Sequence, residues 1–288
     1  MSERGNERAG GTFGMVGAIV GDIVGSRFEW NNRKSKRFTL MKGRAESSRP
    51  CHFTDDTVMT LAVAAAIMRW KGFVGAPFDA LSAETVVRMQ EFGRLYPRVG
   101  YGGAFRRWLR DEAPQPYNSW GNGSAMRVSA CGWAGRTLDE VKAMSRAVTE
   151  VTHNHPEGIK GAEATAVATF LARTGAPIGV IRAVVVRDYY PLGFTLDEIR
   201  PTYAFDVSCQ GSVPQALEAF FESKSFEDAI RNAISIGGDS DTLGAICGAV
   251  AGAYYGVPDG IRAKAESFLD GRLLETLHAF ERRFCAAV

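Results

Sequence analysis

The chain has 288 residues, of which 45% are hydrophobic and 23% charged, a composition that excludes a disordered or a collagen-like protein. Its 34 Lys and Arg residues nearly balance its 32 Asp and Glu residues, so no excess of positive charge indicates a nucleic-acid or membrane surface. Glycine and alanine are abundant, with 32 and 38 residues, which fits closely packed helices as well as loops whose bare backbone approaches a ligand.

The cysteines and the N-terminal segment bear on the compartment of the protein. Five cysteines are scattered without a CxxC pair, which argues against a zinc site or a disulfide framework and predicts a reducing environment. The N-terminal segment is polar and unlike a signal peptide, and no run approaches the ~20 apolar residues that a membrane helix needs. We therefore expect a cytoplasmic protein that binds neither a membrane nor an extended nucleic acid.

The first predicted elements are a tail and a glycine-lined helix. Residues 1–12 are polar, and we expect them to form a flexible tail. Apolar residues then recur at helical spacing over residues 16–24, with Gly17, Gly21 and Gly25 four positions apart. Residues at this spacing share one face of a helix, so the pattern predicts a helix that another helix can approach closely.

The rest of the chain is dominated by helical periodicity. Residues 31–50 are polar and basic and are expected to form an exposed loop. Three Ser/Thr-x-x-Glu/Gln patterns, which start at Thr137, Thr195 and Ser212, predict helix N-termini. Apolar spacing predicts helices over residues 57–70, 79–96, 137–151, 158–172, 179–187, 226–235, 242–255 and 260–284. The fold class predicted is all-α, with a single compact multi-helix domain over residues 13–288 and several helices buried on all sides.

Two clusters of carboxylate and hydroxyl side chains each come directly before a strongly apolar helix, Thr54-Asp55-Asp56-Thr57 and Asp239-Ser240-Asp241-Thr242. Helix capping explains either cluster alone, because Asp, Ser and Thr are preferred at N-caps. One cap needs only one oxygen, however, and several carboxylates in a half-buried site are costly unless a cation neutralises them. Oxygen ligands without thiolate or imidazole favour Mg²⁺ first, and Mn²⁺ or Ca²⁺ next.

A glycine-rich turn and a histidine pair are the next candidates. The turn, Ser119-Trp120-Gly121-Asn122-Gly123-Ser124, could present backbone N–H groups to an anion, although it lacks the ending of a Walker loop and an ordinary turn is the alternative. The segment Thr152-His153-Asn154-His155 has no third metal ligand nearby. We interpret its histidines either as a neutral ring that contacts a ligand or as part of a helix-start turn before Pro156.

Two weaker candidates are a glycine-containing loop and a single glutamate. Tyr101 and Gly102 fit an ordinary loop as well as a ligand contact. Glu29 follows the glycine-lined helix, and a solvated surface glutamate would explain it equally well from the residues alone.

These features, in this order, resemble the ADP-ribosylglycohydrolase family from about Met15 to Phe284. The most specific matches are Phe53-Thr-Asp-Asp-Thr57, Gly121-Asn-Gly-Ser-Ala-Met-Arg127, Thr152-His153 and Ile236-Gly-Gly-Asp-Ser-Asp-Thr-Leu243. The resemblance implies an all-α fold with two metal ions, usually Mg²⁺, in a cleft. It also implies hydrolysis of the glycosidic bond between ADP-ribose and an acceptor, with an ADP-ribosylated protein or small molecule as the substrate.

The resemblance also assigns roles to residues. It implies metal ligation by Thr54, Asp55 and Asp56 from one side and by Asp239, Asp241 and Thr242 from the other. Catalytic candidates are Glu29, which matches a glutamate on a mobile loop, together with Asp56 and Asp241. Substrate contacts are expected from Tyr101, Gly102, Ser119, Trp120, Gly121, Asn122, Gly123, Ser124 and His153. The segment 96–100 lacks an acid that some members have there, so specificity for an arginine linkage is not implied.

Two other functions fit parts of the same pattern. A catalytically inactive ADP-ribose-binding or structural member of the same fold would keep the loop and the fold without turnover, although all the acidic positions are present here. A metal-dependent phosphohydrolase would also use the aspartate clusters, but the paired His-Asp motif common in helical phosphohydrolases is missing from the sequence.

Overall fold

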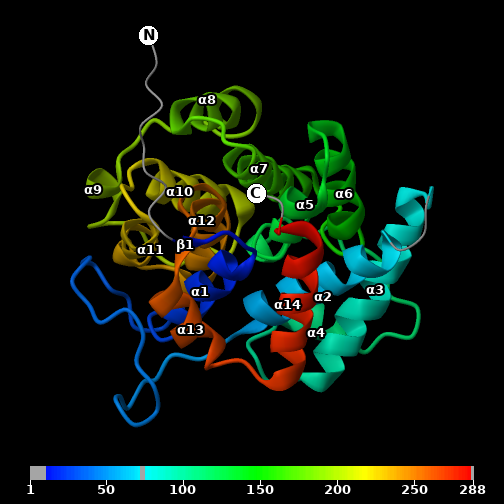
Figure 1. The fold of residues 1–288 in the computed structure, drawn as a ribbon, viewed down its shortest axis with the longest axis horizontal. Helices are drawn as coiled ribbons and strands as arrows, with labels where there is room; N and C mark the ends of the chain where they lie inside the picture. Colours follow the sequence, from blue (N-terminus) through cyan, green and yellow to red (C-terminus); the bar gives the residue numbers. More distant parts are fainter. Residues whose placement is uncertain (1–10, 72–74, 287–288) are drawn as a thin grey trace.

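The computed structural model describes residues 11–71 and 75–286, and this part of the chain forms one compact, mostly helical domain (Figure 1). The fold class predicted from the sequence is confirmed. None of the helices in the described part of the chain is long and apolar enough to cross a membrane. The elements are β1 (Gly11–Thr12), α1 (Val16–Gly25), α2 (Asp55–Trp70), α3 (Phe78–Leu95), α4 (Gly103–Trp108), the 3-10 turn η1 (Asn122–Ser124), α5 (Ser129–Ala134), α6 (Leu138–Glu150), α7 (Pro156–Arg173), α8 (Ile178–Asp188), α9 (Leu196–Ile199), α10 (Cys209–Phe221), α11 (Phe226–Ser235), α12 (Ser240–Tyr255), β2 (Val257–Pro258), α13 (Asp259–Glu266) and α14 (Gly271–Phe284).

The glycine face predicted for α1 packs directly against α12. A Cβ atom at Gly21 would lie 1.8 Å from the carbonyl oxygen of Gly244, and one at Gly17 would lie 2.3 Å from that of Gly248. No side chain fits at such distances, so the two backbones touch and glycine is required on both helices. The close contact predicted for α1 is confirmed. It places the C-terminal end of α1 beside Asp241, at the start of α12.

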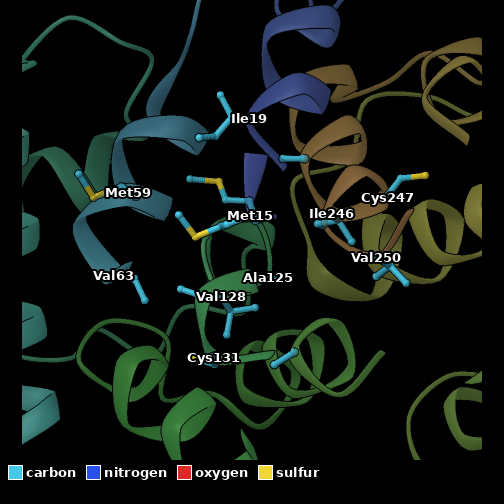
Figure 2. Packing of buried hydrophobic residues seen from close by; sticks show 14 of the residues in the cluster. Met15, Ile19, Met59, Val63, Ala125, Val128, Cys131, Ile246, Cys247 and Val250 are labelled. Atoms are coloured by element: carbon cyan, nitrogen blue, oxygen red, sulfur yellow. The ribbon is translucent and has the colours of Figure 1, made fainter. Parts of the chain in front are cut away.

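The helices α2 and α12, which follow the two acidic clusters, are both largely buried. Fourteen of the sixteen residues of α12 are buried, because small side chains cover almost its whole surface. Figure 2 shows side chains of α1, α2, α5 and α12, among them Ile19, Met59, Cys131 and Ile246, packed in one core. A core packed this tightly fixes the N-terminal ends of α2 and α12 relative to each other.

The structure corrects two helix boundaries. Ser212 was predicted to cap a helix, but α10 begins earlier and its N-cap is Ser208, which accepts from the N–H of Gly211. The Ser212 hydroxyl instead donates to the carbonyl of Asp206. The single helix predicted over 260–284 is two helices, α13 and α14, because the Asp270 side chain caps a new N-terminus. The helical spacing of apolar residues continues across this break, so the sequence predicted one helix.

The N-terminal prediction is partly outside the described residues. Residues 1–10 of the predicted tail cannot be compared, but Gly11 and Thr12 form β1, which pairs antiparallel with β2. A tail is therefore the wrong prediction for these two residues. Their partners, Val257 and Pro258, lie near the other end of the chain, where no local pattern could indicate them.

Candidate active site

The two acidic clusters meet at one cavity of about 420 Å³, although they lie far apart in the sequence. Its acidic wall comes from the loop after α1 and from the N-terminal ends of α2 and α12. Its other wall comes from the glycine-rich turn and from His153, which precedes α7. The predicted residues that line the cavity are Glu29, Asp55, Asp56, Gly102, Ser119, Gly121, Asn122, Gly123, His153, Asp239, Asp241 and Thr242.

Helix capping does not account for the carboxylates of the acidic wall. Thr54 is the N-cap of α2, and its hydroxyl accepts from the N–H of Asp56. Asp239 is the N-cap of α12, but its side chain makes no capping bond and accepts from Asn122 Nδ2 at 2.7 Å instead. The capping role therefore falls to a hydroxyl in one cluster and to no side chain in the other, and the carboxylates remain available for another purpose.

Asp56 lies at the centre of this wall and has an unused oxygen. Its Oδ2 atom accepts from the hydroxyl of Thr242 at 3.3 Å, which joins the two clusters directly. Its Oδ1 atom is buried and has no hydrogen-bond partner in the described part of the chain. An orphaned carboxylate oxygen is costly in the protein interior, and a bound cation would satisfy it.

Asp22 is a candidate site residue that the sequence analysis missed. It is fully buried in α1 and accepts from the N–H and hydroxyl groups of both Thr54 and Thr57. The Thr54 hydroxyl gives its proton to Asp22 Oδ1 at 2.7 Å, so the lone pairs of that hydroxyl point elsewhere. Asp22 thus orients the start of α2. The available signal was a single charged residue within the apolar helix over residues 16–25.

Five carboxylates line the acidic wall, and a sixth, Asp22, lies buried beside Asp56 and Asp241. Among residues 11–71 and 75–286, none of the six forms an ion pair with Lys, Arg or His. Burial, followed by the negative charge of Asp241, raises the pKa of Glu29 to about 7. Burial raises the pKa of Asp239 to about 6 and that of Asp241 well above its ordinary value. Burial also raises the pKa values of Asp22, Asp55 and Asp56, and the charge of Asp241 adds to the shift of the last two.

The positions of these carboxylates suit two cations. Asp22, Asp56 and Asp241 can direct one oxygen each to a common point, and Glu29, Asp239 and Asp241 can do the same. The groups share Asp241, so two ions would lie side by side. All the donors are oxygen atoms, which fits a hard divalent cation.

Glu29 is held over the acidic wall by the loop that follows α1. The neighbouring residue, Trp30, stacks on Phe205 with ring centroids 4.9 Å apart. Further along the loop, Asn32 Oδ1 accepts from the N–H of Gly238, and the Lys34 ammonium donates to the carbonyl of Ile236. These contacts connect the loop to the segment before α12. The surface glutamate considered from the sequence is therefore half-buried, and it faces the other carboxylates.

The sequence left open whether the histidines contact a ligand or form a helix-start turn, and the structure places one histidine in each position. His155 caps α7, because its Nδ1 accepts from the N–H of Glu157 and Pro156 follows in the first turn. His153 is buried beside the cavity, where its Nε2 lies 3.5 Å from a Cβ position at either Gly121 or Gly123. Burial and the charge of Arg127 lower the pKa of His153 well below its ordinary value, so the ring is neutral.

Several polar groups of the glycine-rich turn are already hydrogen-bonded to other groups of the protein. The N–H of Gly121 donates to the Ser119 hydroxyl, and that of Asn122 donates to the carbonyl of Val207. The Ser124 hydroxyl is buried and donates to the carbonyl of Gly158. Two backbone donors expected to face an anion are thus already engaged, and the turn is fixed in place by these bonds.

Four predicted residues lie behind or beside the cavity instead of lining it. Thr54 and Ser124 are buried just behind the acidic wall and the turn. Tyr101 is buried and its hydroxyl has no partner in the described part of the chain. Trp120 is half-exposed and lies edge-to-face against His155, with ring centroids 5.5 Å apart.

Comparison with known proteins agrees with this geometry. The model of the ADP-ribosylglycohydrolase family matches residues 2–284. The chain belongs to this family. It is 25% identical to human (Homo sapiens) ADP-ribosylhydrolase ARH3, with 92% of this chain and 91% of that protein covered. It is 28% identical to the ADP-ribosylarginine hydrolase Tri1 of Pseudomonas putida (strain GB-1), with 88% and 72% covered.

Two further relatives extend the comparison. The ADP-ribosyl-(dinitrogen reductase) glycohydrolase of Rhodospirillum rubrum is 26% identical, with 88% of this chain and 87% of the relative covered. A solved structure described as an ADP-ribosylglycohydrolase-related protein complex superimposes with a TM-score of 0.62 and 25% identity, over 93% and 92% of the two chains. This member of the ADP-ribosylglycohydrolase family therefore has relatives that act on ADP-ribose conjugates, and its acidic wall can hold metal ions.

Proposed function

We propose that the chain is a Mg²⁺-dependent hydrolase that cleaves the glycosidic bond between ADP-ribose and an acceptor in a protein or a small molecule. The observation that carries the proposal is the cavity itself. Five carboxylates with no counter-charge among the described residues line one wall, while a turn without charged side chains and a neutral histidine form the other. Such a site can hold divalent ions on one side and the polar body of a nucleotide on the other.

The proposed metal ligands are the residues that the family pattern indicates. Thr54, Asp55 and Asp56 would bind from the start of α2, and Asp239, Asp241 and Thr242 from the start of α12. The unpartnered Oδ1 of Asp56 and the absence of basic partners in the described part of the chain support this set. Mg²⁺ is the first choice because all the donors are hard oxygen atoms, and Mn²⁺ is compatible with the same set.

When bound, the ions would orient the ribose hydroxyls and activate water. The protein supplies the remaining chemistry. Glu29, with a pKa of about 7, exists in both protonation states near neutral pH, so it can donate a proton to the leaving acceptor or accept one from water. Asp56 and Asp241 hold negative charge close to the position where positive charge builds up on the ribose. The glycine-rich turn and His153 would hold the ADP part.

The direct test is an assay for free ADP-ribose. Peptides ADP-ribosylated on arginine or serine, and O-acetyl-ADP-ribose, are incubated with the protein and Mg²⁺. We expect at least one of them to release ADP-ribose, and this release should stop when EDTA is added. No turnover of any of the three by a protein shown to bind metal would contradict the proposal for these substrates.

The alternative on the same fold is an inactive ADP-ribose binder. It predicts that ADP-ribose binds with no release from any conjugate, and that Asp241→Ala leaves this binding unchanged. A phosphohydrolase would instead cleave the diphosphate bridge of the same compounds and release AMP. The three functions are thus distinguished by the product that appears.

A further inference from the structure

Arg127 is a buried arginine whose charge no acid in the described chain compensates. It is 1% exposed and forms no ion pair with any described residue. Burial lowers its pKa to about 10, which still leaves it charged at neutral pH. Its Nη2 atom donates to the Thr152 hydroxyl at 2.7 Å, and its Nε has no partner. A buried unpaired cation is costly, so its position beside the cavity calls for an explanation.

The bond between Arg127 and Thr152 determines the direction of the next one. A guanidinium can only donate, so the Thr152 oxygen accepts from Arg127. The hydroxyl has one proton left to give, and its two possible acceptors are His153 Nδ1 at 2.7 Å and the carbonyl of Thr149 at 3.5 Å. The shorter contact is the better hydrogen bond, so His153 Nδ1 accepts it.

The state of the His153 ring follows. A neutral imidazole that accepts at Nδ1 carries its proton on Nε2. The charged and titratable groups that face the ring are Arg127 and Tyr117, whose ring centroid lies 5.9 Å away. Neither is an acid that would favour the imidazolium. The Nε2 atom has no hydrogen-bond partner among the described residues, and it lies beside Gly121 and Gly123 at the cavity.

We propose that Arg127 and Thr152 are positioning residues that hold His153 as the neutral Nε2–H tautomer, so that this ring presents a fixed hydrogen-bond donor to an oxygen of the bound nucleotide diphosphate. The choice of ligand rests on the proposed function, whereas the tautomer does not. The buried charge of Arg127 then has two effects. It orders the Thr152 hydroxyl, and it adds a positive potential to a wall that lacks basic groups at its surface.

A matched pair of variants separates this role from simple packing. Thr152→Val keeps the shape of the side chain and removes the hydroxyl, whereas Thr152→Ser keeps the hydroxyl. The ¹⁵N chemical shifts of the His153 ring, assigned by their loss in His153→Gln, report the tautomer in the ligand-free protein. We expect the Nε2–H form in the wild type and in Thr152→Ser, and a mixture of both tautomers in Thr152→Val.

Binding of ADP-ribose, measured by calorimetry, provides the second readout. Thr152→Val should weaken binding about tenfold, the effect of one lost hydrogen bond to a charged group, while Thr152→Ser should stay close to the wild type. An unchanged tautomer in Thr152→Val would overturn the proposal, whatever its affinity. A mixture of tautomers with wild-type affinity would overturn the ligand contact. If the wild type does not bind ADP-ribose at all, the proposed function fails, and the ring spectra still decide the role of Thr152.

Discussion

The two walls of the cavity differ in how their charge is distributed. The acidic wall is lined by five carboxylates whose pKa values are all raised, and no basic side chain of the described chain pairs with them. The opposite wall carries no carboxylate, and its one cation, Arg127, is buried and unpaired. Each wall therefore has a charge that the protein leaves unbalanced. The acidic wall can hold cations from solution, whereas the other wall fits a ligand that carries negative charge.

The largest expected effect comes from removing the carboxylate that both metal groups share. Asp241→Ala should abolish turnover, and it should also remove the stabilisation that Mg²⁺ gives. For the wild type, Mg²⁺ at 100 times its Kd should raise the free energy of unfolding by about 2.7 kcal/mol for each ion bound. Thermal unfolding with and without Mg²⁺ measures this. Asp188→Ala, a surface carboxylate at the end of α8, is the control and should behave like the wild type. Retention of both properties by Asp241→Ala would show that the acidic wall is not the metal site.

The second prediction distinguishes the role of Glu29 in proton transfer from the role of the other carboxylates of the acidic wall in metal binding. Glu29→Gln removes the group with a pKa of about 7 while preserving its size. We expect turnover to fall by about 10²–10⁴-fold, which is typical for the loss of a general acid or base. The Mg²⁺-induced shift in unfolding temperature should persist, because the proposed ligands Asp55, Asp56, Asp239 and Asp241 remain. Wild-type turnover by Glu29→Gln would eliminate its catalytic role.

The third prediction concerns Asp22, which is buried beside the acidic wall and accepts hydrogen bonds from Thr54 and Thr57. Asp22→Asn keeps its size but places an amide where donors converge, and it should lower the free energy of unfolding by about 2–3 kcal/mol. Mg²⁺ affinity should fall about 10–100-fold, the usual effect of losing a partner that orients a ligand. Urea unfolding and calorimetry give the two values. An unchanged stability would mean that Asp22 does not orient the start of α2.

The smallest effect is a pH dependence of the metal-free protein. The folded protein holds protons on Glu29 and Asp239 more tightly than the unfolded chain, because burial raises their pKa values to about 7 and about 6. The stability from these protons is complete below about pH 4, where unfolded carboxyl groups titrate, and it is lost as the pH rises through 6 and 7. In EDTA the unfolding temperature should therefore fall between pH 5 and pH 8. The gain from Mg²⁺ should grow over the same range, and a gain that shrinks would contradict the account.

The sequence predicted the features of this site that depend on neighbouring residues, but not those that depend on contacts between distant segments. The helices α2 and α12 and the acidic clusters before them follow from local spacing and capping preferences, and the structure confirms the helices. That the clusters meet depends on contacts such as the one between Gly21 and Gly244, which joins residues more than 200 positions apart. No short pattern encodes such a contact, and only the resemblance to a family indicated it.

Residues that act behind the cavity were the hardest to predict. Asp22 was included in an apolar helix, since helical spacing says nothing about which polar groups converge on a buried carboxylate. Arg127 appeared only as the last residue of a motif, and the contacts with an anion were expected from backbone N–H groups of the glycine-rich turn. Its unpaired burial beside His153 is a tertiary property that no composition or spacing reveals.

The measurement that tests the central claim most directly is a count of divalent ions bound by the acidic wall. Mn²⁺, which suits the same oxygen ligands, is titrated into the metal-free protein and followed by calorimetry and by the loss of the electron paramagnetic resonance signal of the free ion. The account predicts two ions per chain in the wild type and none bound with comparable affinity in Asp241→Ala. Binding of two ions by both proteins, or of none by the wild type, would contradict it.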